Sequence, residues 1–134
     1  MKSIAGRFAL VLAAAAVIAA VGISQEQAPS VKRNVLLKQD STIPGREIVM
    51  ASVELPPGGR EGRHTHAAEV YGFVVEGAVT VDREGEPTRT FQTGEVFSIK
   101  PGQIHEGKNE GKTTARIDAV FVAEKGKPLT TQAK

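Results

Sequence analysis

The chain has 134 residues, of which 40% are hydrophobic, with no cysteine and a formal net charge of +2 at pH 7. This length is typical of one small domain, and the lack of cysteine excludes disulfides, thiol catalysis and lipid-modified cysteine. The sequence has neither a run of like charge nor a basic patch interleaved with aromatic residues, which argues against nucleic acid as a partner.

The first 24 residues have the layout of a secretory signal peptide. Lys2 and Arg7 precede the apolar run 8–21, and small residues lead to an expected cleavage site after Ser24. The alternative is an uncleaved anchor, but the 14 apolar residues fall short of the roughly 20 that a spanning helix needs. We therefore expect an exported protein, periplasmic or secreted, with no stable membrane span after processing. Cleavage removes two of the 17 basic residues and none of the 15 acidic ones, which leaves the mature chain formally neutral.

The rest of the chain shows the pattern of an all-β domain. Residues 25–34 are polar and form an expected flexible leader, the domain is expected to span residues 35–124, and residues 125–134 form a C-terminal arm. Short apolar runs separated by glycine and proline, without helical periodicity, favour an antiparallel sandwich or barrel. The expected strands are 34–38, 46–55, 71–76, 78–82, 89–91, 95–99 and 115–124.

The three histidines of the chain stand at positions that one site can use. His64 and His66 are two residues apart, so in a strand their side chains share a face. His105 follows a strand and a turn that an antiparallel barrel can bring beside this pair. Three neutral imidazoles and one carboxylate suit a first-row divalent metal, and Glu69 is the nearest carboxylate. A lone His-x-His is a weak signal, because two surface histidines on an exposed strand would look the same.

Two motifs in this region resemble those of the cupin family. In residues 58–77, a glycine is followed after five residues by His-Thr-His, a nearby glutamate and a closing glycine. In residues 94–109, a glycine is followed after five residues by Lys-Pro-Gly, then by histidine and asparagine. The resemblance covers most of the chain after the signal segment and implies a double-stranded β-helix jelly-roll barrel. It also implies one divalent transition metal (Fe, Mn, Ni, Cu or Zn), held by His64, His66, Glu69 and His105.

The chain departs from these motifs in two places. The second motif usually has proline where Lys100 stands, whereas this chain has Pro101 one residue later, a change that we expect to affect only the turn. The first motif usually has its glutamate at the position of Val70, one residue after Glu69. A shift of one residue turns a side chain to the opposite face of a strand. Either a β-bulge over residues 67–70 aims Glu69 inward or the site has three protein ligands; we expect the bulge.

Other residues near the motifs receive structural interpretations. Gly72 lies inside an apolar strand and predicts tight packing by a neighbour. Tyr71 is expected in the core with a satisfied hydroxyl group, and Asn109 is expected to fix the loop after His105. Expected barrel-lining or core residues are Phe73, Val75, Phe97 and Ile99. Arg60 and Arg63 are expected to be solvated, with recognition of a substrate carboxylate as the alternative.

The resemblance implies two functions between which the fold cannot choose. The first is a metal-dependent enzyme, of dioxygenase, decarboxylase or isomerase type, that acts on a small organic acid or carbonyl compound. Apart from the ligands, only Tyr71 and Glu76 offer proton transfer in the motif region, which favours chemistry by the metal itself. The second is a non-catalytic module that binds a metal or small ligand. The apolar strand 34–38 is consistent with a homodimer interface or with edge pairing inside one subunit.

Overall fold

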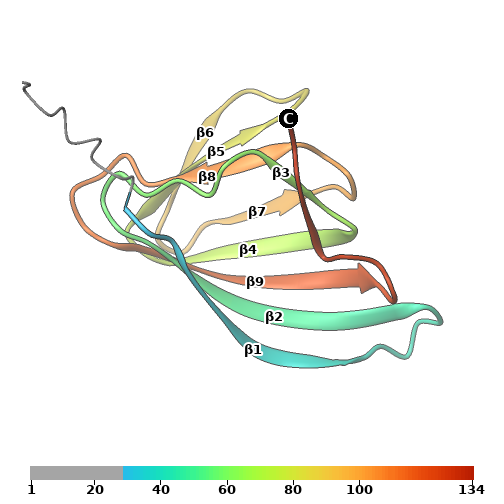
Figure 1. Ribbon diagram of the computed structural model, residues 1–134. Helices are drawn as coiled ribbons and strands as arrows, with labels where there is room; N and C mark the ends of the chain where they lie inside the picture. The colour runs from blue at the N-terminus through green and yellow to red at the C-terminus, as the bar shows by residue number, and fades with distance from the viewer. Residues whose placement is uncertain (1–28) are drawn as a thin grey trace, which may run out of the picture.

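The computed structural model describes residues 29–134, so the predicted signal peptide and residues 25–28 of the predicted leader lie outside the described residues. Within residues 29–134, no helix is long and apolar enough to cross a membrane. The described chain forms ten strands (Figure 1). They are β1 (Lys32–Asp40), β2 (Arg46–Leu55), β3 (His64–His66), β4 (Ala68–Glu76), β5 (Ala78–Arg83), β6 (Arg89–Gln92), β7 (Val96–Ile99), β8 (His105–Lys108), β9 (Ala115–Glu124) and β10 (Thr130–Gln132).

The strands form two five-stranded sheets that enclose the core between them (Figure 1). The strand order is β1-β2-β9-β4-β7 in one sheet, called here the large sheet, and β10-β3-β8-β5-β6 in the other, the small sheet. Every pairing between neighbouring strands is antiparallel. The prediction of an all-β antiparallel fold is therefore confirmed.

The core is built by strict alternation along the long strands of the large sheet. In β9 every second residue is buried, and the inward set is Ala115, Ile117, Ala119, Phe121 and Ala123. This period of two is the one expected when one face of a sheet packs against the core. The largest fully buried side chains are Leu55, Val74, Val79 and Val81. Burial of each such side chain contributes about 1.5–3 kcal/mol relative to exposure.

The orientation of β4 differs from what we expected for its aromatic residues. Val70 and Val74 face inward, whereas Tyr71 is 47% exposed and Phe73 is 44% exposed. The prediction that Tyr71 and Phe73 belong to the core is therefore wrong, because the inward face of β4 falls on the even-numbered residues. The tight packing predicted at Gly72 is confirmed.

Gly72 makes room for an aromatic ring from the neighbouring strand. Gly72 pairs with Phe97 of β7, and a Cβ added to Gly72 would lie 2.4 Å from Cζ of Phe97. The ring of Phe97 therefore lies directly over the glycine, on the inward side of the large sheet. Phe97 packs against the core and Ile99 is 2% exposed, so their predicted barrel-lining positions are confirmed.

The two ends of the described chain both join the sheets. β1 begins at Lys32, inside the predicted leader, and pairs along its length with β2 at the edge of the large sheet. Its residues are exposed, including Val35 and Leu36. At the other end, β10 lies inside the predicted C-terminal arm and pairs with β3 at the edge of the small sheet. The arm therefore contacts the strand that carries the first two histidines.

Candidate metal centre

Two short neighbouring strands of the small sheet carry the three histidines. His64 of β3 lies directly opposite His105 of β8 in the antiparallel register, so these two side chains share a face. His66 lies two residues beyond His64 and shares that face as well. All three are buried, with exposures of 3%, 7% and 5% for His64, His66 and His105. The predicted convergence of the three histidines is present in the structure.

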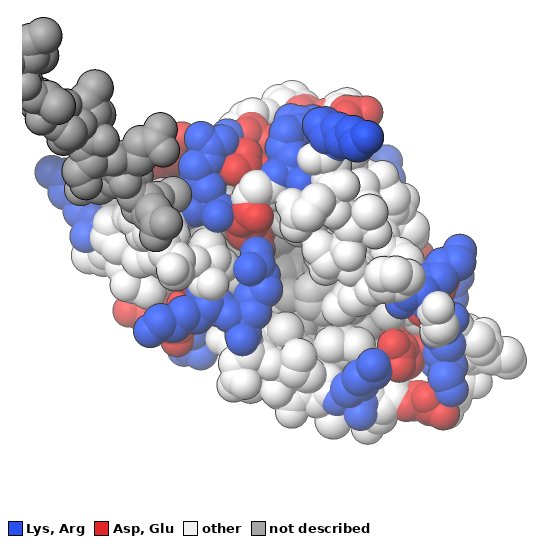
Figure 2. Space-filling model, viewed as in Figure 1, with Lys and Arg blue, Asp and Glu red and all other residues white. Residues whose placement is uncertain are grey.

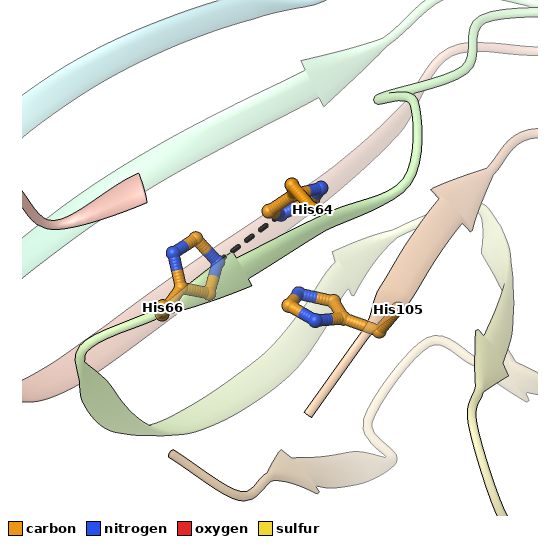
Figure 3. A group of neighbouring side chains, drawn as sticks. All are labelled: His64, His66 and His105. Carbon is orange, nitrogen blue, oxygen red and sulfur yellow. Dashed lines mark hydrogen bonds between the residues drawn. The ribbon is translucent and has the colours of Figure 1, made fainter. Parts of the chain in front are cut away.

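The three rings lie close enough to bind a single ion (Figure 3). Their centroids are 4.2–4.9 Å apart, and each ring offers a nitrogen that lies within 4.8 Å of the nitrogens offered by the other two. Phe121 packs edge-on against His66, with the centroids 5.0 Å apart. The cluster is therefore compact and bordered by the apolar core of the large sheet.

Backbone carbonyl groups fix the orientation of each ring. Nδ1 of His64, of His66 and of His105 each lies within hydrogen-bond distance of a carbonyl oxygen. In that order, the carbonyl groups belong to Gly62, Leu129 and Gln103, at 2.7, 3.1 and 2.9 Å. A carbonyl oxygen only accepts hydrogen bonds, so Nδ1 carries the proton and Nε2 keeps its lone pair. This is the arrangement that orients metal-ligating histidines.

The contact between His64 and His66 tests whether these residues fit a metal. Their Nε2 atoms lie 3.1 Å apart (dashed line, Figure 3). With both Nδ1 atoms acting as donors, this contact brings two lone pairs together, an arrangement that a cation between them stabilises. Two nitrogens bound at about 2.0–2.1 Å to one ion are themselves about 3 Å apart. The donor set therefore fits a divalent transition metal.

Burial also favours the neutral form of two of the three rings, those of His66 and His105, at physiological pH. Burial lowers the pKa of His66 to about 4, with further lowering by neighbouring His64 and His105. Burial likewise lowers the pKa of His105 to about 4, despite its hydrogen bond to the carbonyl group of Gln103. A metal binds the neutral imidazole, so these rings need not release protons to coordinate an ion at pH 7.

Glu69 lies outside this cluster. It is exposed on the outer face of β4 and accepts a hydrogen bond of 3.0 Å from the hydroxyl group of Tyr71. The register between β4 and β9 runs without interruption from Ala68 to Val70, so the bulge expected over residues 67–70 is wrong. Val70 takes the inward position and is 4% exposed. The structure thus brings together three of the four predicted ligands, and strand alternation turns Glu69 away.

A small cavity adjoins the histidine cluster between the two sheets. It encloses about 40 Å³ accessible to the centres of water-sized molecules. In Figure 2 a hollow opens between the sheets, with uncharged residues on its floor and charged residues around its periphery. The residues that line the cavity are Val53, Glu61, His66, Val70, Val81, Phe97, Ile99, His105, Gly107, Ile117, Ala119 and Phe121. The histidines therefore border a largely apolar pocket.

Sequence reasoning missed Glu61, which is the carboxylate of this pocket. Its side chain is 13% exposed and Oε2 accepts a hydrogen bond of 3.2 Å from the backbone N–H of Gly107. Gly62 follows with φ of 77°, a left-handed conformation that interrupts the alternation of strand residues. The side-chain direction of Glu61 could therefore not be inferred by counting back from His64.

The flanking polar residues have structural partners. Arg60 forms two hydrogen bonds, of 3.0 and 2.9 Å, with the carboxylate of Glu106, and this arginine lowers the pKa of Glu106. Arg63 lies 3.6 Å from Glu84 at the surface. Neither arginine lines the cavity among the described residues, so the arrangement does not support the alternative role in substrate recognition.

Asn109 has the loop-fixing role predicted for it. Its side-chain N–H groups donate to the carbonyl oxygens of Leu55 and Thr113, at 2.8 and 2.7 Å. Its side-chain oxygen accepts a hydrogen bond of 2.9 Å from the backbone N–H of Gly111. Asn109 is 2% exposed, so these bonds satisfy a buried amide group and tie the loop after β8 to the end of β2.

Two facing antiparallel sheets with an inward histidine triad define a class of small β-barrel proteins. The family model described as "Cupin domain" matches residues 51–122, and the chain belongs to this family. A solved structure from Klebsiella pneumoniae, an uncharacterized conserved protein with a double-stranded β-helix domain, is similar with a TM-score of 0.66 and 20% identity. The match covers 79% of this chain and 89% of that one. The predicted double-stranded β-helix jelly roll is thereby confirmed.

Two other proteins are more similar to this chain in sequence than the Klebsiella pneumoniae protein is. Germin-like protein subfamily 2 member 2 of Arabidopsis thaliana is 35% identical over 80 residues, which are 55% of this chain and 36% of the relative. A structure of recombinant oxalate oxidase in complex with glycolate is 29% identical with a TM-score of 0.58, over 63% of this chain and 45% of that one. The chain spans little more than a third of the length of the curated relatives that it matches.

Proposed function

We propose that this protein is an exported cupin that binds one divalent transition metal through His64, His66 and His105. We further propose that it is a metal-dependent enzyme acting on a small organic acid or carbonyl compound. The observation that carries the metal site is the common orientation of the three rings, whose Nδ1 atoms are all held by backbone carbonyl groups. This arrangement leaves three Nε2 lone pairs for one ion.

The surrounding residues would give such a site its chemical character. A metal held by three imidazoles keeps coordination positions for water or substrate and supplies Lewis-acid or oxygen chemistry when bound. The chain itself contributes orientation, through the carbonyl groups that hold the rings. It also contributes exclusion of water, through apolar side chains such as Val70, Ile117 and Phe121 that line the adjoining cavity.

The size of the cavity and the comparisons favour a small ligand. About 40 Å³ accessible to the centres of water-sized molecules accommodates a few water-sized groups, because a single water needs about 10–15 Å³ of such space. The related oxalate oxidase structure contains glycolate, a two-carbon acid. Both observations support an organic acid or carbonyl compound of two or three carbons as the ligand.

The metal site and the activity are tested together with matched variants. Elemental analysis of protein isolated from its native compartment should find about one transition metal per chain and identify it. The metal should be lost in His105→Ala and kept in Thr65→Ala, because Thr65 lies between the two β3 histidines but on the opposite face. Equal metal contents in wild type and His105→Ala would contradict the site.

Turnover is measured on the same proteins. The metal-loaded wild type is incubated with a panel of small acids and carbonyl compounds, with and without oxygen, and consumption is followed by NMR. We expect at least one compound to be consumed by wild type and Thr65→Ala but not by His105→Ala. Metal binding without consumption of any compound would instead favour the non-catalytic binding module.

Export and self-association are further proposals. Export predicts that protein recovered from the producing cell begins at Gln25, which mass spectrometry of the intact chain measures. The exposed edge strand β1, with Val35 and Leu36 at 61% and 53% exposure, supports a homodimer through this edge. Light scattering of wild type and Leu36→Lys measures the mass in solution, and a monomeric wild type would contradict the dimer.

A further inference from the structure

Glu61 brings a carboxylate into the cavity that borders the histidine cluster. It lines this cavity together with His66 and His105, and the other lining residues are apolar or glycine. Its oxygens do not belong to the group of atoms that lie within 4.8 Å of one another in the histidine cluster. Glu61 therefore lies beside the metal site rather than among the residues positioned to ligate the ion.

The strand that carries His105 holds the Glu61 carboxylate in place. The backbone N–H of Glu61 donates to the carbonyl oxygen of Gly107 at 3.0 Å, and the carboxylate accepts from the N–H of Gly107 at 3.2 Å. A Cβ added to Gly107 would lie 2.5 Å from Oε2 of Glu61. The missing side chain at Gly107 therefore provides the space that the carboxylate fills, on the same strand face as His105.

The carboxylate retains the capacity to accept a further hydrogen bond. Oε1 accepts from Nη2 of Arg33 at 3.3 Å, and Oε2 accepts from Gly107. A carboxylate has about four lone-pair positions, so each oxygen has one left. The cavity lining among the described residues includes no arginine or lysine, and Glu61 is its only carboxylate. Arg33, which pairs with Glu61, is 52% exposed and lies outside this lining.

We propose that Glu61 is the ligand-selecting residue of the pocket, which accepts a hydrogen bond from the O–H or N–H group of a small monoanionic acid held at the histidines. This inference rests on the proposed function. The carboxylate of the ligand faces the metal, and its donor group faces Glu61. The pocket therefore selects hydroxy acids over acids of the same size that lack a donor. It disfavours diacids, because their second carboxylate meets the charge of Glu61 without a cation in the lining.

The proposal is tested with cobalt(II) as the bound metal and three two-carbon acids as probes. Acetate lacks the donor, glycolate has it, and oxalate carries a second carboxylate. Affinities are read from the visible absorption of the cobalt-loaded protein during titration. We expect wild type to bind glycolate at least about tenfold more tightly than acetate, since a hydrogen bond to a charged group contributes about that much. In Glu61→Gln this preference should fall severalfold and the affinity for oxalate should rise.

Two further variants separate the role of Glu61 from general effects. Glu84→Gln is the matched control, because it removes a carboxylate that is 63% exposed and lies outside the lining, and it should behave as wild type. Gly107→Ala should move the Glu61 carboxylate out of its position and reproduce the loss of glycolate preference with the charge retained. All these variants should bind one cobalt per chain.

The outcomes distinguish this inference from the proposed function. A wild type that binds no cobalt would overturn both. Cobalt binding with the same ratio of glycolate to acetate affinity in wild type and Glu61→Gln would overturn only the role of Glu61. Loss of cobalt in Glu61→Gln would also overturn it, because the residue would then be a metal ligand.

Discussion

The two sheets of the barrel differ in what they contribute to the site. The large sheet has four strands of nine or ten residues and supplies most of the apolar lining of the cavity. The small sheet holds all three histidines on β3 and β8, strands of three and four residues. The long, regularly paired strands thus supply the apolar side of the cavity. The three histidines, as potential metal ligands, lie on short strands that are flanked by turns and loops.

This difference has a physical basis. Long strands such as β2 and β9 pair over ten positions and bury a continuous inner face. A substitution on that face therefore disturbs the packing of the core. Short strands bring turn carbonyl groups close to their own side chains, as with the carbonyl group of Gly62 and the ring of His64. Polar side chains can therefore be oriented in the small sheet without a second layer of buried polar residues.

Removal of one histidine from the small sheet is the strongest test of this difference between the two sheets. His66→Ala should lower metal affinity at least about 100-fold, since even the residues that support a ligand contribute about 10–100-fold. Isothermal titration with zinc measures the affinity, and Thr131→Ala on the neighbouring strand β10 is the control. An affinity within threefold of wild type would contradict the assignment.

Truncation in the large sheet should have the opposite signature. Leu55 of β2 is fully buried, so Leu55→Ala should lower the free energy of unfolding by about 2–5 kcal/mol. Metal content per folded chain should stay unchanged. Urea denaturation measures the loss, with Glu54→Ala as the exposed control on the same strand. A comparable loss in both variants would argue against a core position for Leu55.

Acid should destabilise the metal-free protein through the small sheet. The pKa values of His66 and His105 in the native state are about 4, below the ordinary value of 6.5, so the unfolded chain binds more protons between these pH values. Stability is then complete above about pH 6.5 and falls as the pH drops to about 4, by up to about 3 kcal/mol for each ring. Urea denaturation at pH 7.5 and 4.5 measures the difference, which His66→Gln should reduce.

The smallest effect is expected on the outer face of the large sheet. Glu69 is exposed and bonded to Tyr71, so Glu69→Gln should leave metal content unchanged and alter stability by less than about 1 kcal/mol. Elemental analysis beside wild type checks the first expectation. A large loss of metal would restore Glu69 as a ligand and contradict the observed strand orientation.

The histidine site was predictable because it depends on local rules. The alternation of strand residues places His64 and His66 on one face whatever the rest of the chain does. The position of His105 needed only an antiparallel neighbour. Glu69 followed the same alternation, and the expected bulge was an added assumption that the regular pairing of β4 with β9 does not support.

The remaining errors have causes that alternation alone could not reveal. Phe73 was expected to line the barrel or lie in the core, yet its face of β4 points outward, and folded proteins expose much apolar surface. Glu61 was missed because Gly62, with φ of 77°, changes the direction of the chain before His64. The contact of Leu129 with His66 joins residues 63 positions apart, and no local sequence pattern predicts it.

Because of that last contact, the proposed metal centre depends on the integrity of the C-terminal segment. The carbonyl group of Leu129 and the hydroxyl group of Thr130 both lie 3.1 Å from Nδ1 of His66, and exposed residues 125–128 connect them to β9. Proteolytic cleavage at Lys125 would leave every histidine in the chain but sever the covalent link that keeps one ring aligned. We therefore expect limited digestion to weaken metal binding at the proposed site while the barrel stays folded.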